Sequence, residues 1–291
     1  MTFTTRELTL EDHDEVRLLA ETVWDGRDYT PRTFPDWIKS NNNYTLGTFS
    51  GNELVALANL ELVPDTDIGW VEGLRVKDGY RDQGLGTRIV EEIVDIANKN
   101  DVKTLWYATG SLNDASKQVA LNAGFHLALS VGYLKIESPY PDHPKPSPVV
   151  VPMEVGPSRL QELLRSSPDL VDAKYLPLAW SFEKPDLEGL QRLAKQTDFR
   201  VVIGEDGLAH ALYYSKVVGT DDEKRATYSV FAHDRAIFVD VMSRILDDLE
   251  SSGIGRAAFF LGPRAKEWSK MLGYVDSEQD DKAFLLYEMN P

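Results

Sequence analysis

The sequence predicts an α/β protein built from two similar domains in tandem, each an α+β fold with a mixed sheet and helices on its faces. Three observations lead to this prediction. Strand-like segments alternate with amphipathic helical segments along both halves of the 291 residues. A proline-rich segment, 138–148, interrupts this alternation. Beyond it, the same order of strands and helices recurs. We therefore expect domains at 1–137 and 149–291, joined by a linker.

The first half predicts the order β-α-α-β-β-β-α-β-α-β. Ser50-Gly51-Asn52 separates two strand-like runs and indicates a hairpin. The helix over 84–98 has the clearest pattern, because apolar residues recur along one face and acidic residues along the other. The predicted strands are 3–10, 44–49, 54–62, 69–76, 104–109 and 127–136, and the predicted helices are 11–23, 33–38, 84–98 and 114–123.

The proline-rich segment and the second half predict a linker followed by a second copy. The density of proline in 138–148 disfavours both helix and sheet, so an extended linker is expected. Gly273-Tyr274 ends a strand-helix segment as Gly124-Phe125 does in the first half, which indicates an internal duplication. The alternative to an internal duplication is that the two halves are unrelated α/β segments. The predicted strands are 201–203, 209–218, 226–231, 255–261 and 283–289, and the predicted helices are 237–249 and 264–272.

Composition and charge exclude several classes of function. A net charge of −16 disfavours nucleic acid as a partner. No apolar run is long enough to cross a membrane, the first residues lack a signal pattern, and cysteine is absent, so a cytoplasmic protein is expected. The 5 histidines lack metal-ligand spacing, and no metal site is predicted.

A glycine-containing turn, 79–87, lies between a strand and the long helix. The first N–H groups of a helix have no partner within it and carry a partial positive charge, so they suit a pyrophosphate. Gly84 and Gly86 would let the backbone approach such a ligand, and Arg81 adds a full charge. Arg75, Lys77 and Arg88 surround the turn, although basic residues at this spacing also suit a merely solvated patch.

The turn, with its flanking strand and helix, resembles the hallmark of the GNAT superfamily of acetyl-CoA-dependent N-acetyltransferases. That hallmark, Gln/Arg-x-x-Gly-x-Gly/Ala, is matched by Arg81, Gly84 and Gly86, and the resemblance extends over about residues 2–137. It implies that acetyl-CoA binds to the turn, to the preceding strand and to the start of a later helix. The implied cofactor-binding residues are Leu74, Arg75, Val76, Arg81, Asp82, Gln83, Gly84, Leu85, Gly86, Thr87, Asn113 and Ser116.

The resemblance also implies catalytic roles. Glu72 stands where many relatives place the carboxylate that removes the amine proton, and its apolar neighbours would raise its pKa. The N–H of Leu74 corresponds to the oxyanion donor. The tyrosine that usually acts as general acid is replaced by Ala120, which is a departure from the family pattern. Tyr133 is the first candidate for that role and Tyr107 the second.

The segment 24–37 is rich in aromatic and charged residues and resembles the acceptor wall of the histidine N-acetyltransferase-like branch. It implies a small primary amine, such as a free amino acid, as acceptor. Protein N-termini or lysines are an alternative, and so is a non-catalytic acetyl-CoA-binding regulatory module. The expected acceptor-binding residues are Trp24, Asp28, Tyr29, Arg32 and Glu72, and Asp25 and Arg27 are further candidates for holding its charged groups.

The second half lacks this motif. Phe231 to Ala236 stands where the turn should fall and contains no glycine, so this copy is expected to bind no CoA. It would complete the acceptor pocket, with Trp180, Tyr213 and Tyr214 as candidate walls, or serve as a structural partner.

Overall fold

The computed structural model describes residues 2–21, 23, 28–219, 224–274 and 282–291, and every structural statement below applies to these residues. They form two compact units. The first unit comprises Met1–Thr109, Asn113–Ala128 and Leu286–Pro291, and the second comprises Gly110–Leu112 and Leu129–Leu285. No helix of the described ranges is long and apolar enough to cross a bilayer.

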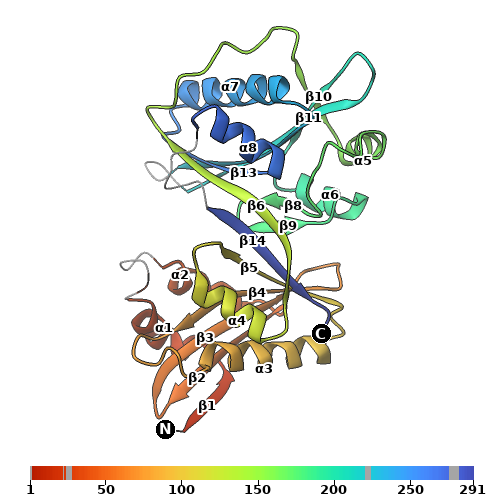
Figure 1. Cartoon of the computed structure of the whole chain (residues 1–291). Helices are drawn as coiled ribbons and strands as arrows, with labels where there is room; N and C mark the ends of the chain where they lie inside the picture. Colours follow the sequence, from red (N-terminus) through yellow and green to blue (C-terminus); the bar gives the residue numbers. More distant parts are fainter. Residues whose placement is uncertain (1, 22, 24–27, 220–223, 275–281) are drawn as a thin grey trace. The chain divides into compact units, whose positions relative to one another are not determined.

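The first unit is a mixed sheet with helices on both faces (Figure 1). Its strand order is β1-β2-β3-β4-β5-β14, in which β1 to β4 pair antiparallel and β4 and β5 pair parallel. Its elements are β1 (Phe3–Glu7), η1 (Leu10–Asp12), α1 (His13–Ala20), α2 (Thr30–Lys39), β2 (Asn43–Ser50), β3 (Glu53–Leu62), β4 (Ile68–Val76), α3 (Leu85–Lys99), β5 (Thr104–Gly110), α4 (Asp114–Asn122), the start of β6 (His126–Glu137) and the end of β14 (Ala283–Met289).

Helices α1 and α2 cover one face of this sheet, and α3 and α4 cover the other. Gly73 of β4 lies against Trp37 of α2, whereas its neighbour Leu74 lies near Gly86 of α3. Helices α2 and α3 therefore pack against different sides of this strand. Gly86 also packs against Val119 of α4.

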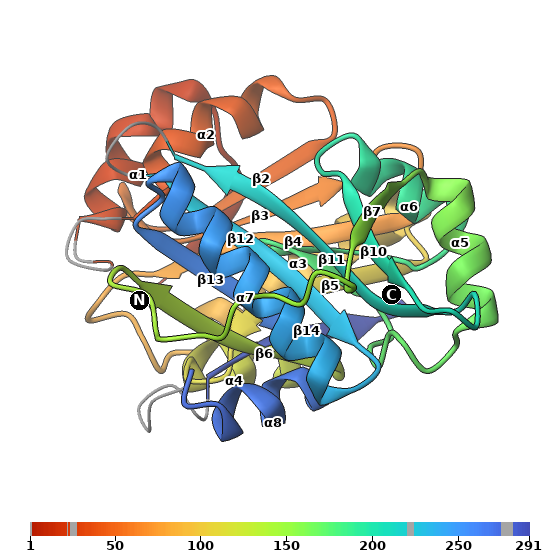
Figure 2. The same ribbon diagram turned by 90° about the horizontal axis from the view of Figure 1, so that it is seen from above.

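The second unit repeats this arrangement. Its strand order is β7-β10-β11-β12-β13-β6, antiparallel except for the parallel pair β12–β13. Figure 2 shows α7 lying along the strands of this unit, and α7 contacts β11 and β12. Its further elements are β7 (Pro152–Val155), α5 (Pro157–Ser166), β8 (Leu176–Leu178), β9 (Ser181–Glu183), α6 (Leu187–Ala194), β10 (Phe199–Ile203), β11 (Ala209–Val218), β12 (Arg225–Ala232), α7 (Arg235–Ser252), β13 (Arg256–Leu261) and α8 (Pro263–Met271).

The two units are related by an exchange of their last strands. In each unit, a parallel strand pair is joined by a helix, β4-α3-β5 in the first and β12-α7-β13 in the second, and a short helix follows. The strand after that helix crosses over: most of β6 pairs with β13 in the second unit, and the end of β14 joins the first. The predicted recurrence is therefore present in the topology.

The proline-rich segment is not a free linker between the units. It has neither helix nor strand, as expected, but it belongs to the second unit and lies along α7. Ser147 N donates to Asp240 Oδ1 over 2.7 Å, and Arg244 Nη2 donates to the carbonyls of Ser147 and Val150 over 3.1 and 2.7 Å. The unit division therefore differs from the predicted boundary, because strand exchange moves most of 126–137 into the second unit and 286–291 into the first.

The exchanged strand predicts that the first unit depends on residues 286–291. Their removal would expose the edge of β5 and remove the buried side chains of Leu286 and Tyr287, which are 0% and 5% exposed. We expect the truncated chain to unfold at a lower temperature and to lose affinity for ligands of the first unit. Removal of Asn290 and Pro291 alone, which follow β14, is the matched control and should change neither measurement.

Candidate active site

A β-bulge in β4 shapes the centre of the first unit. Leu57 and Asn59 of β3 pair with Arg75 and Glu72 of β4, so two residues of β4, Gly73 and Leu74, oppose Ala58. Gly73 has a φ of +67°. A Cβ at this position would lie 2.6 Å from the indole of Trp37. The bulge therefore requires glycine both for its left-handed backbone and for the ring that packs on it.

The parallel pairing of β4 with β5 ends just before this bulge. It runs from Ile68↔Thr104 to Val71↔Tyr107. Leu74 and Val76, whose backbones are expected to pair with the pantetheine arm, lie beyond the last of these pairs.

The predicted phosphate-binding turn leads directly into α3. Gly79, Asp82 and Gly84 have left-handed backbones, with φ values of +85°, +60° and +75°, and Gly84 is the N-cap of α3. Arg81 is exposed and forms a 3.0 Å ion pair with Asp78. The turn thus exposes a cation beside the positive end of a helix.

The two glycines of the motif also have roles within the protein, and the predicted close approach of a ligand stays a prediction. A Cβ at Gly84 would meet open space, so this position requires glycine for its backbone conformation. A Cβ at Gly86 would lie 3.0 Å from Val119, so that glycine allows α3 to pack closely on α4. Asp82 and Gln83 are exposed, Leu85 is buried and Thr87 is partly buried.

Glu72 carries a strongly perturbed carboxyl group. Burial, followed by the nearby carboxylate of Glu61, raises its pKa, which lies at about 7. Hydrogen bonds from Asn59 and Trp37 and the charge of Arg75 act in the opposite direction. A carboxyl group with this pKa accepts a proton readily near neutral pH.

Tyr107, at the last β4–β5 pair, lies in the same unit. Its hydroxyl is 2.6 Å from Ser116 Oγ, and burial raises its pKa to about 12. Tyr133 belongs to the second unit, where its ring packs against those of Trp180 and Phe260. Ala120, at the usual position of the acid, is buried within α4.

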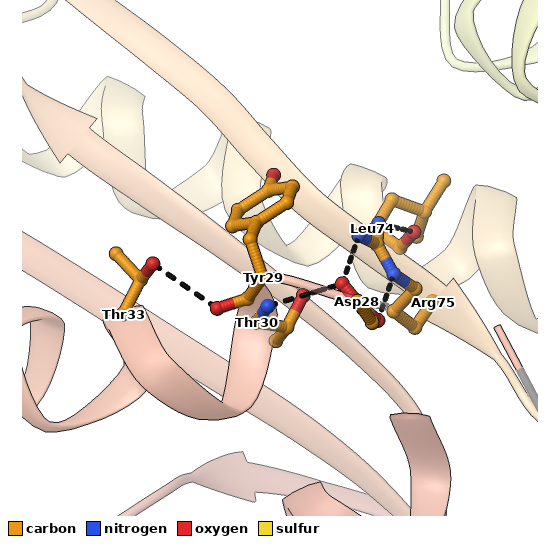
Figure 3. A network of polar contacts seen from close by, with 6 residues as sticks. All are labelled: Asp28, Tyr29, Thr30, Thr33, Leu74 and Arg75. Carbon is orange, nitrogen blue, oxygen red and sulfur yellow. Dashed lines mark hydrogen bonds and ion pairs between the residues drawn. The ribbon is translucent and has the colours of Figure 1, made fainter. Parts of the chain in front are cut away.

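Asp28, expected to hold the ammonium group of the acceptor, is instead part of a buried ion pair (Figure 3). Its two carboxylate oxygens accept from Arg75 Nη2 and Nε over 2.7 Å each, and Oδ1 also accepts from the backbone N–H of Thr30. Burial alone would raise its pKa, but the hydrogen bonds from Arg75 and Thr30 hold the pKa below its ordinary value. The Asp28 side chain is 1% exposed, so its charge is already compensated.

This ion pair connects the start of α2 to the strand expected to bind the cofactor. Arg75 also donates to the carbonyl of Leu74 over 2.8 Å, and its guanidinium lies 5.3 Å from the ring centre of Tyr29. The sequence suggested a cofactor-binding role for Arg75, whereas its side chain binds Asp28 and the carbonyl of Leu74. Arg32 is exposed on α2, and Trp24, Asp25 and Arg27 lie outside the described residues.

Asn113, expected to contact the cofactor, is the N-cap of α4. Its side chain accepts a 3.1 Å hydrogen bond from the backbone N–H of Ser116. Sequence reasoning missed Asn59, which is fully buried and contacts Glu72. A polar residue within the otherwise apolar run 54–60 is the signal that could have identified it.

Comparisons with known proteins match part of the chain to N-acetyltransferases. Residues 10–125 match the model of the Acetyltransferase (GNAT) family. A segment of 77 residues is 29% identical to a histidine N-acetyltransferase of Oreochromis niloticus and covers 26% of this chain. The corresponding enzyme of Scomber australasicus is 27% identical over 77 residues. The matched segment spans 23% of the length of each of these relatives.

Several solved structures, including the following two, match over nearly the whole chain. A GCN5-related N-acetyltransferase from Sphaerobacter thermophilus has a TM-score of 0.63 and 11% identity, and the match covers 99% of this chain and 95% of that one. A tandem GNAT protein from the clavulanic acid biosynthesis pathway has a TM-score of 0.57 and 12% identity, with coverage of 99% and 98%. At these identities, the likeness establishes a tandem fold and nothing more.

Because the ion pair is buried, we expect Asp28→Asn to destabilise the protein strongly. The variant leaves the Arg75 guanidinium buried without its counter-charge, which costs about 3 kcal/mol of unfolding free energy. Chemical denaturation of the variant at neutral pH should show this loss.

Asp14→Asn is the matched control. Asp14 pairs with Arg17, but their side chains are 86% and 62% exposed. We expect a change within about 0.5 kcal/mol for an exposed pair. An equal loss of unfolding free energy in the two variants would show that the Asp28–Arg75 pair stabilises the fold no more than an exposed ion pair does.

Proposed function

We propose that this chain transfers the acetyl group of acetyl-CoA to the primary amine of a small molecule, since residues 10–125 match the model of the Acetyltransferase (GNAT) family. The buried Glu72 carboxyl, with a pKa of about 7 and a place beside the β4 bulge, is the observation that carries this proposal. A base of this kind can remove the proton that an amine must lose on acylation.

The turn before α3 is the proposed cofactor site. Its left-handed residues lead into the helix N-terminus, where unpaired N–H groups and the helix dipole favour a pyrophosphate. Arg81 adds a cation there, and the backbone of Leu74 and Val76 is proposed to pair with the pantetheine arm. Acetyl-CoA supplies the acetyl thioester.

The proposed chemistry uses groups of the first unit. The nitrogen attacks as the neutral amine, and Glu72 takes one proton from it as the bond from nitrogen to the acetyl carbon forms. The N–H of Leu74 donates to the oxygen that gains negative charge. The carbon–sulfur bond then breaks, and the Tyr107 hydroxyl donates a hydrogen bond to the departing thiolate.

Tyr107 is proposed as a donor of a hydrogen bond rather than of a whole proton. Its pKa of about 12 keeps it protonated throughout the working range. A thiol has a pKa of about 8.5, so complete proton transfer from Tyr107 to the thiolate would be unfavourable. Tyr133 stays a prediction, since it belongs to the second unit.

The proposed acceptor is a free amino acid or a similar small amine. The 77-residue segment shared with the histidine N-acetyltransferases supports this class. With Asp28 engaged by Arg75, Glu72 is the proposed contact for the ammonium group, and Tyr29 and the exposed Arg32 are proposed to contact the rest of the acceptor.

The second unit is proposed to bind no CoA. Asp234 caps α7, and its carboxylate accepts from the N–H groups of Ala236 and Ile237 over 2.8 and 3.1 Å, so a side chain already occupies this helix terminus. The parallel strands β12 and β13 also stay paired without a bulge from Ala226↔Ala257 to Val230↔Leu261, which supports the proposal because their backbones are already bonded to each other over this stretch.

Glu72→Gln tests the proposed base. We expect kcat/KM to fall by about 10²–10⁴-fold, measured as thiol release from acetyl-CoA with a panel of amino acids, polyamines and peptides. In the native protein, activity should rise with pH through about 7 as Glu72 ionises, and this rise should be absent from the variant.

Folding provides a control for this variant. A raised pKa in the folded state makes the native protein lose stability as pH rises from the unfolded value towards 7. Glu72→Gln should therefore be at least as stable as the native protein at pH 8. Glu91→Gln, on the exposed side of α3, should leave the pH profile unchanged. Turnover of peptides but of no small amine would contradict the proposed acceptor class.

Calorimetric titration tests the proposed cofactor sites. We expect one CoA to bind per chain, and Arg81→Glu should weaken its affinity by about tenfold or more, because the phosphates then meet a negative charge. Arg17→Glu reverses an exposed charge on α1 and should leave the affinity unchanged. Two equivalent sites would contradict the proposal for the second unit.

A further inference from the structure

We infer that Asn59 positions the Glu72 carboxyl group and keeps it in its proton-accepting form. This inference rests on the proposed role of Glu72 as base. Asn59 lies directly across from Glu72 in the β3–β4 register and is 0% exposed. Its Nδ2 donates to Glu72 Oε1 over 3.2 Å.

The amide of Asn59 is held by two further residues. Thr45 Oγ1 donates to Asn59 Oδ1 over 2.8 Å, and the second N–H of Asn59 donates to Asn43 Oδ1 over 2.6 Å. Both residues come from β2, so the side chain is fixed from one strand and directed at the next. The carboxylate accepts only, which requires that the NH₂ group face it.

Placing asparagine here is costly for the fold. Asparagine is disfavoured in strands, and a buried amide must find partners for every donor. Its neighbours Ala58 and Leu60 are apolar and fully buried. The amide is satisfied here by Thr45 and Asn43, which leaves one of its N–H groups directed at Glu72.

The hydrogen bond opposes the groups that favour the neutral acid. Burial and the carboxylate of Glu61, two residues along β3, raise the Glu72 pKa. Asn59 is the first of the groups that lower it, followed by the Trp37 indole of α2 and by Arg75, the cation of β4. The Tyr29 hydroxyl, before α2, is also close enough to interact with Glu72. Without Asn59, fewer molecules would carry an ionised base at neutral pH.

Asn59→Leu tests this inference through the pH profile of kcat/KM. The acidic limb of this profile is the rise of kcat/KM with pH as Glu72 ionises. Loss of a hydrogen bond to a charged group should move this limb to higher pH by about one unit. Activity at pH 7 should therefore fall about five- to tenfold and return to near the native value at pH 9. A purely structural defect would lower activity at every pH and leave the limb in place.

Asn59→Asp is the second variant and preserves the shape of the side chain. It keeps an acceptor for Thr45 but replaces the donor to Glu72 with a second carboxyl group. The limb should move to higher pH at least as far as in Asn59→Leu, because like charges disfavour ionisation. This variant provides the test if Asn59→Leu does not fold.

Thr48→Val is the matched control. Thr48 lies in β2, is 4% exposed, and shares a 3.1 Å hydrogen bond with Thr5 at a distance from Glu72. It removes a buried hydroxyl from the same sheet and should leave the limb in place. A limb that stays at its native pH in both Asn59 variants would overturn the inference.

The profile of Glu72→Gln separates this result from failure of the proposed function. If Glu72→Gln loses the limb and the Asn59 variants do not move it, the base is correct and the positioning role is wrong. If Glu72→Gln retains the limb, the proposed base itself is wrong.

Discussion

The packing of Trp37 on Gly73 is the constraint on which the first unit depends. The left-handed glycine inserts an extra residue into β4, and the indole occupies the space that a side chain would need. Pairing with β5 ends immediately before this point, and Glu72 is fixed opposite Asn59 at its edge. One contact between a helix and a strand thereby sets both the end of the parallel pairing and the register of the proposed base.

Two carboxyl groups of the first unit differ in pKa because their surroundings differ. Asp28 and Glu72 are both largely removed from water, which by itself would raise the pKa of both carboxyl groups. Asp28 receives a bidentate guanidinium and stays charged, whereas Glu72 receives a neutral amide and titrates near neutrality. The first is therefore compensated within the fold, and the second is the proposed base.

Local pattern predicted much of the fold and less of the site. The strands β11 and β14 begin and end where the sequence indicated, because their apolar runs have clear boundaries. The elements from β7 to α6 were not predicted, and neither was the strand exchange, since long-range pairing leaves no local signal. Glu72 was found from its place in a recognised strand. The engagement of Asp28 by Arg75 joins residues 47 positions apart, which spacing could not reveal.

The exchanged strand also has a consequence for synthesis on the ribosome. The N-terminal unit emerges first, but its sheet lacks the strand that borders β5 until residues 286–289 have been translated. The nascent first unit therefore keeps an open sheet edge beside β5 until the second unit has been translated. The first unit, and with it the proposed acetyl-CoA site, would be complete only after the second unit has been made.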